Sequence, residues 1–266
     1  MTALVGGVVL LAPFATAAPV QAAGSVASAW VGDDSSSTPL RLRFDTPAQA
    51  PGSVVREVVN SGTADVSAEI VSAGGGAWRS VDRHGQSVET PAFTRWEDAP
   101  QAILGVTPEG SGDALAPGYA SFEFGADFQI DWESDGTSRD DGDNLVQRGL
   151  SGDVSQYKIQ IDNRRPACRI KGSAGSVKVV ASNTVPASTW INVSCRRYAE
   201  RVVLTVMDMD SGAQSITTDY GLTGAVRPET PDVPLSVGGK LNADGGIVYS
   251  SDQFNGVIDE VFVRVY

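Results

Sequence analysis

Few side chains in this sequence are of the types that carry out covalent or metal chemistry. It has one histidine, His84, and two cysteines, Cys168 and Cys195. No serine sits in a nucleophile elbow, so a Ser-His-Asp arrangement around His84 is not indicated. The thiols lack a Cys-x-x-Cys motif, which favours a disulfide in an exported chain over a redox pair or a metal pair. Their separation of 27 residues suits the two ends of a β-hairpin, and we expect no catalytic residue.

An acidic segment, residues 131–144, is a second candidate for chemistry because it holds six carboxylates. Calcium is bound by six to eight oxygens, which such a segment could supply in part. The spacing does not follow the Asp-x-Asp-x-Asp-Gly pattern of a helix-loop-helix calcium site. The segment is therefore predicted to be a hydrated hairpin tip rather than a metal site.

Two tryptophans, Trp78 and Trp96, are candidates for ligand binding. Trp78 lies in a glycine-rich context and Trp96 among charged residues. An exposed ring of this kind could stack against a sugar. The alternative is that each ring is buried under a loop, where it would contribute to packing instead.

The elements that would position these residues are strands. Alternation with a period of two dominates, and no stretch shows the three-and-four apolar spacing of a substantial helix. Short runs separated by turn residues are typical of a sandwich or barrel. The runs 53–59 and 66–71 flank Asn60-Ser61-Gly62, which predicts a hairpin. Residues 208–234 form the longest irregular stretch, and further strands are expected at 144–148, 156–162, 167–171, 176–181, 189–197 and 201–207.

The end of the chain is the clearest strand. Asn255-Gly256 is a turn signal, and the residues after it alternate in type. The alternation predicts two faces, one with Val257, Asp259, Val261, Val263 and Val265 and the other with Ile258, Glu260, Phe262, Arg264 and Tyr266.

The beginning of the chain indicates export. In residues 1–23 an apolar run is followed by small residues, and cleavage after Ala22 or Ala23 fits the rule for secretory signal peptides. The run is too short to span a bilayer, so we expect a secreted mature chain without an integral membrane segment. Residues 24–38 are predicted to be a flexible lead and residues 39–266 a single domain. The net charge of −12 argues against nucleic acid and anionic membranes as partners.

The order of strand features from Phe122 onward resembles that of laminin-G-like domains of exported actinobacterial proteins. The similarity rests on Phe122-x-Phe124-Gly125-x-Asp127-Phe128, Trp190-Ile191-x-Val193-x-Cys195 and the closing Gly256-Val257-Ile258-Asp259-Glu260-Val261. The resemblance implies an all-β, concanavalin A-like jelly-roll sandwich of two antiparallel sheets, which acts by binding rather than by catalysis.

The resemblance also bears on individual residues. An Asp at the place of Asp259 often ligates a structural calcium in such jelly rolls, which makes Asp259 the candidate metal ligand. Related β-glucanases carry Glu-x-Asp-x-Glu on one strand, with two of the carboxylates as nucleophile and acid/base. This chain has Gln129-Ile130-Asp131-Trp132-Glu133, and an amide at position 129 cannot form a glycosyl-enzyme.

These observations predict a secreted, non-catalytic module that recognises a glycan or an extracellular protein. One alternative is a structural or adhesion component of the cell envelope that has no small ligand. The other is a degenerate β-glucanase-like hydrolase, which the glutamine at position 129 disfavours.

Overall fold

A computed structural model of the chain describes residues 37–83, 85–92, 94, 99–131, 143–228, 233–248 and 250–266. These residues belong to one compact unit, Ser35–Tyr266. They form fifteen strands, and the described part of the chain contains no helix. The all-β class expected from the alternation is confirmed.

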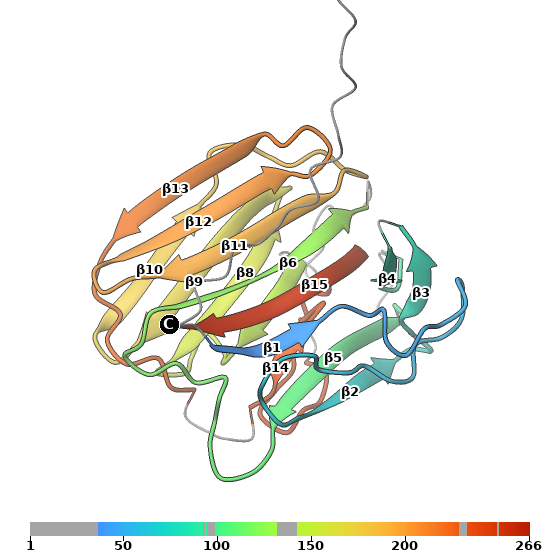
Figure 1. Cartoon of the computed structure of the whole chain (residues 1–266), viewed down its shortest axis with the longest axis horizontal. Coiled ribbons are helices and arrows are strands. Elements are labelled where there is room, and N and C mark those ends of the chain that lie inside the picture. Colours follow the sequence, from blue (N-terminus) through green and yellow to red (C-terminus); the bar gives the residue numbers. More distant parts are fainter. Residues whose placement is uncertain are drawn as a thin grey trace, which may run out of the picture. The chain divides into compact units, whose positions relative to one another are not determined.

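The strands form two antiparallel sheets that pack as a jelly-roll sandwich (Figure 1). Sheet I has eight strands, in the order β13 (Gln214–Tyr220), β12 (Arg201–Asp208), β11 (Ile191–Arg197), β6 (Phe122–Ile130), β15 (Gly256–Val265), β4 (Gln86–Glu89) and β3 (Arg79–Asp82), with β1 (Ser37–Leu42) also paired to β15. Sheet II has seven strands, in the order β10 (Gly175–Val180), β9 (Arg165–Gly172), β8 (Gln156–Asp162), β7 (Asp143–Arg148), β14 (Leu235–Val237), β5 (Gln101–Pro108) and β2 (Val66–Ala73). In Figure 1, sheet I lies in front of the fainter strands β8, β9 and β10 of sheet II.

The core between the sheets follows from alternation along the strands. On β6, Phe122, Phe124 and Phe128 point into it and are fully buried. The ring of Tyr157 on β8 packs edge-on against Phe124, with centroids 4.9 Å apart. Burial of each such side chain is worth about 1.5–3 kcal/mol, so the facing aromatic rings hold the two sheets together.

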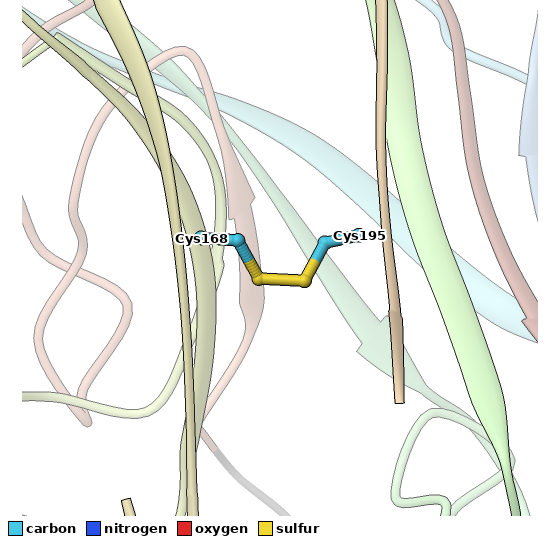
Figure 2. Close-up of a disulfide and its surroundings, with 2 residues drawn as sticks. All are labelled: Cys168 and Cys195. Atoms are coloured by element: carbon cyan, nitrogen blue, oxygen red, sulfur yellow. A yellow bond between two sulfur atoms is a disulfide. The ribbon is translucent and has the colours of Figure 1, made fainter. Parts of the chain in front are cut away.

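The disulfide between Cys168 and Cys195 is present, with Cα atoms 6.1 Å apart. It does not join the ends of a hairpin, as the spacing suggested. Cys168 lies on β9 of sheet II and Cys195 on β11 of sheet I, so the bond crosses the core (Figure 2). Both residues are fully buried. Each cysteine occupies a position of its strand whose side chain points into the core, and the two positions face each other.

Removal of this bond by the double substitution Cys168→Ala and Cys195→Ala is expected to lower the free energy of unfolding by about 3 kcal/mol. The bond closes a loop of 27 residues and restricts the unfolded chain accordingly. Urea unfolding of the two proteins would measure the difference. The matched control is the oxidised wild type unfolded with and without reductant. A variant as stable as the oxidised wild type would contradict the prediction.

The closing strand β15 departs from the predicted alternation. A β-bulge lies between Asp259 and Phe262, and Glu260 there has a φ of 44°. Because the bulge inserts an extra residue, the faces exchange beyond it. Ile258, Val261 and Val263 therefore face the core, while Asp259 and Phe262 face outward. The expectation that Asp259 shares a face with Val261 and Val263 is wrong for this reason.

The predicted hairpin over residues 53–71 is also wrong. Residues 53–59 form no strand beyond a single bridge at Val54, and β2 pairs with β5 instead. The motif Asn60-Ser61-Gly62, from which the hairpin was predicted, has another role. Oδ1 of Asn60 accepts the N–H of Gly62 and of Arg41, and its Nδ2 donates to the carbonyls of Pro39 and Ala64. Asn60 therefore connects its loop to β1 through hydrogen bonds and is not part of a hairpin turn.

The remaining strand predictions agree closely with the structure. β8 covers residues 156–162 as predicted, and β12 extends the predicted 201–207 by one residue. The stretch 208–234, expected to be irregular, contains the edge strand β13. β1 begins at Ser37, two residues before the predicted domain boundary. The predicted signal peptide, residues 1–23, lies outside the described residues. No helix in the described part is long and apolar enough to cross a membrane.

Candidate functional site

The outer face of sheet I, turned away from the core, carries polar residues that the sandwich itself does not require. Glu123 and Asp127 on β6, Asn192 on β11 and Asp259 on β15 all point to this face, and none is more than 8% exposed. Asn192, Asp127 and Asp259 lie opposite one another across three adjacent strands. Asn192 donates from Nδ2 to Oδ1 of Asp127 at 2.5 Å. The row is therefore fixed in register by the sheet and by a side-chain hydrogen bond.

Asp259 is a strongly perturbed carboxyl group on this face. Its burial raises the pKa of Asp259 to about 8, and the nearby carboxylates of Glu260, Asp127 and Asp45 act in the same direction. The N–H of Glu260 donates to Oδ1 of Asp259 at 2.7 Å and opposes the shift. Glu260 is itself paired with Arg41 at 3.0 Å and Arg43 at 3.3 Å. The charged form of Asp259 is thus costly unless a cation or a proton compensates it.

The predicted calcium ligand Asp259 therefore lies in a place where a cation would be favoured by charge. However, the described residues contain no group of three or more Asp, Glu, His or Cys side chains placed to hold a metal ion. Because calcium takes six to eight oxygens, an ion here would need most of its ligands from backbone carbonyls.

Farther along the same face, arginines and tyrosines alternate. We call Glu123, Arg196, Tyr198, Arg201, Tyr220 and Tyr266 the Arg–Tyr row. The guanidinium of Arg196 lies 3.8 Å from the ring centroid of Tyr266 and 4.9 Å from that of Tyr198. Arg201 lies 4.5 Å from the ring of Tyr198. Such stacking holds flexible arginine side chains in place.

The two ends of the Arg–Tyr row differ in accessibility. At one end, the hydroxyl of Tyr266 donates to Oε2 of Glu123 at 2.7 Å. At the other end, Tyr220 lies opposite Arg201 in the β12–β13 ladder and is 73% exposed. Nε of Arg196 is buried and has no acceptor within the described part of the chain. The exposed aromatic surface of the row therefore lies at the Tyr220 end.

The face offers no arrangement suited to glycoside hydrolysis among the described residues. Gln129, at the position of the glucanase nucleophile, accepts from Arg83 at 3.1 Å and donates to the carbonyl of Ser188 at 2.7 Å. Asp127 and Asp259 oppose each other, but each is only 7% exposed, so a sugar ring cannot reach between them. His84, Trp132 and Glu133 lie outside the described residues, as does most of the acidic segment 131–144.

The interpretation of Trp78 as an exposed ligand-binding ring is wrong. Its side chain is fully buried, its Nε1 donates to the carbonyl of Ala102 at 2.9 Å, and Phe44 packs against it edge-on. Trp78 is a core residue because its single polar atom is satisfied inside the protein. Trp96, the other candidate, lies outside the described residues.

Sequence analysis missed the Arg–Tyr row. Of its residues, only Tyr266 was named, as the last residue of an alternating strand. The available signal was the polar phase of β11, in which Asn192, Ser194 and Arg196 share one face. Which strands flank that face depends on sheet order, which a single sequence does not reveal.

The architecture defines the chain as an all-β jelly-roll sandwich of two antiparallel sheets. No family model matches the sequence, and no curated protein matches it either. Among solved structures, domain 4 of the extracellular arabinanase AbnA from Geobacillus stearothermophilus, in complex with arabinotriose, is similar with a TM-score of 0.56 at 12% identity. The match covers 86% of this chain and 93% of that domain.

Toxin binding domains are similar as well. The binding domain of Paraclostridial Mosquitocidal Protein 1 gives a TM-score of 0.53 at 12% identity, and that of botulinum neurotoxin DC, in complex with rat synaptotagmin II, gives 0.54 at 11%. Each match covers 85% of this chain and 48% of the toxin domain, so this chain spans about half their length. At these identities the similarity shows the fold.

Proposed function

We propose that this chain is a non-catalytic binding module that recognises a glycan or an extracellular protein. The observation that carries the proposal is the Arg–Tyr row on the outer face of sheet I. Arg196 is held against the rings of Tyr198 and Tyr266, and the exposed Arg201 is held against the ring of Tyr198. Ordering these side chains before a ligand arrives lowers the entropy that binding must overcome.

The chemistry of the row suits a hydroxyl-bearing or acidic ligand. Tyrosine rings provide flat apolar surface for the C–H face of a sugar, and guanidinium groups donate to hydroxyl or carboxylate oxygens. The similar arabinanase domain is in complex with a trisaccharide and the similar botulinum domain with a protein. These cases support binding by this architecture and leave the ligand of this chain to be determined.

Two narrower parts of the prediction belong to this proposal. One is membership of the laminin-G-like domains of exported actinobacterial proteins, which the closing strand and the cross-sheet disulfide support. The other is secretion, which the buried disulfide supports because such bonds persist in oxidising compartments. A structural calcium at Asp259 is a separate proposal, supported by the buried and anionic setting of that carboxyl group.

The substitution Tyr198→Ala tests the binding role because Tyr198 stacks with both Arg196 and Arg201. A glycan array and an extracellular-protein panel would first identify a ligand of the wild type. We expect the variant to bind that ligand about tenfold more weakly, since it loses the stacking surface and frees both arginines.

Arg169→Ala on β9 of sheet II is the matched control, because Arg169 lies away from this face and makes a hydrogen bond to Ser176. It should bind like the wild type. Equal affinity of the Tyr198→Ala variant would rule out the row as the site. Absence of any ligand in both panels would favour the structural or adhesion role instead.

A further inference from the structure

A second recessed surface lies on the opposite side of the sandwich, on the outer face of sheet II. It is a groove of about 650 Å³ between strands β2 and β5 and the turn at residues 241–246. Ala68 and Ile70 of β2 pack against the core, so the intervening Ser67, Glu69 and Val71 line the groove. Its volume is in the range of small-molecule binding sites. The groove is on a different sheet from the Arg–Tyr row.

One wall of this groove is a turn that is held in place by internal hydrogen bonds. Leu241 and Ile247 form a bridge, and Oδ1 of Asn242 accepts the N–H groups of Asp244 at 3.0 Å and Gly246 at 2.7 Å. At its base, Leu241 rests on Gly105 of β5, where an added Cβ would lie 3.0 Å from Leu241 Cδ1. Glycine at position 105 thus lets the turn dock on the sheet, which fixes the width of the groove.

The chemistry of the lining selects for a cation. Glu69 stands on the sheet and Asp244 on the turn, and neither carboxylate makes a hydrogen bond or an ion pair with other residues in the ranges described. Both of these charged side chains are acidic, so an anionic ligand would be repelled from this groove. A cationic group between the two walls would be stabilised by charge-assisted hydrogen bonds.

The rest of the lining favours a sugar ring over a peptide. Val71, Pro234 and Leu241 supply apolar surface, and Ser67 and Thr107 supply hydroxyl groups. These are the contacts that a pyranose makes with its C–H face and its hydroxyls. β2 is the edge strand of sheet II, but the groove is lined by side chains on the face of the sheet, so a ligand in it would not pair with the backbone of that edge as an extended peptide does.

We propose that this groove binds a short oligosaccharide that carries free amino groups, with the amines placed between Glu69 and Asp244. The inference adds a second site to the proposed binding module and does not depend on the Arg–Tyr row.

Isothermal titration of the full chain at mildly acidic pH, where the sugar amine is protonated, tests the proposal. The probes are a glucosamine tetramer and its fully N-acetylated counterpart of equal length. We expect binding of the glucosamine tetramer that weakens with added salt, and at least tenfold weaker binding of the acetylated tetramer. Glu69→Gln and Asp244→Asn should each weaken binding of the glucosamine tetramer about tenfold.

Glu57→Gln is the matched control, since it removes an equal charge at an exposed position outside the groove. It should leave the affinity for the glucosamine tetramer unchanged. Both groove positions are exposed, so the melting temperatures should match the wild type and report an intact fold. The proposal is overturned by equal binding of the two tetramers, by no binding of either, or by unchanged affinity in the Glu69→Gln variant. A lysine-bearing peptide that binds in place of the glucosamine tetramer would likewise overturn the amino-sugar assignment.

Discussion

Asp113→Asn is expected to lower the free energy of unfolding by about 3–5 kcal/mol, because it removes the counter-charge of a buried arginine. Arg148 ends β7, and its side chain is fully buried. Its Nη1 lies 2.6 Å from Oδ1 of Asp113, and its Nε donates to the carbonyl of Val233 at 3.2 Å. Nη2 has no acceptor in the part of the chain that the structure describes. Asp113 is therefore the group that makes the buried guanidinium tolerable.

Urea unfolding at neutral pH would measure this effect, and a double-mutant comparison makes it specific. Arg148→Met removes the buried charge, so adding Asp113→Asn to that variant should cost much less than it does in the wild type. If Asp113→Asn cost less than about 1 kcal/mol, the value typical of an exposed pair, the guanidinium would not depend on Asp113. Equal costs in the two backgrounds would show that Asp113 acts through loop packing instead.

The second large effect concerns Asp259 and is a dependence of stability on pH. The folded-state pKa of Asp259 is raised to about 8, whereas an unfolded Asp titrates at about 3.9. Between these values the folded state holds a proton that the unfolded state has lost. The stabilisation from this group is therefore complete below about pH 4 and is lost as the pH rises to about 8. The side chain of the Asp259→Asn variant cannot ionise, so the variant does not lose this stability. The free energy of unfolding of the variant minus that of the wild type should therefore rise by about 4 kcal/mol between pH 5 and pH 8.

Chemical unfolding of both proteins in chelator across this pH range would provide the measurement. Asp219→Asn, at an exposed position on β13, is the control and should show no such gain. A difference between the Asp259→Asn variant and the wild type that does not change with pH would show that the pKa of Asp259 is not raised.

Calcium added at pH 8 separates the two ways of compensating Asp259. If an ion binds there, calcium should raise the stability of the wild type and leave the Asp259→Asn variant unchanged. If calcium has no effect on the wild type, the structural-calcium proposal is wrong and a proton performs the compensation.

The fold was largely predictable from the sequence because burial between two sheets imposes a period of two on each strand. The runs that became β8, β9, β10, β11 and β12 show that period, and their predicted bounds differ from the structure by two residues or fewer. The cysteine pairing was predictable because only one pairing exists. That the bond crosses the core, rather than closing a hairpin, depended on which strands belong to which sheet.

The candidate sites were much less predictable. Trp78 has a sequence context that suits a surface ring, yet the carbonyl of Ala102 satisfies its indole N–H inside the core. The groove on sheet II depends on Gly105 accepting Leu241, a contact between segments more than a hundred residues apart.

What the sequence by itself determined was the class of fold, the positions of most strands and the pairing of the two thiols, because each follows from local alternation or from counting. Only the tertiary structure decided which side chains meet on the outer face of sheet I. The bulge at Glu260 moved Asp259 opposite Asp127, and the sheet order brought Tyr266 beside Arg196. Both results come from strand register and order, which depend on contacts between distant segments and leave no periodic signal in the chain.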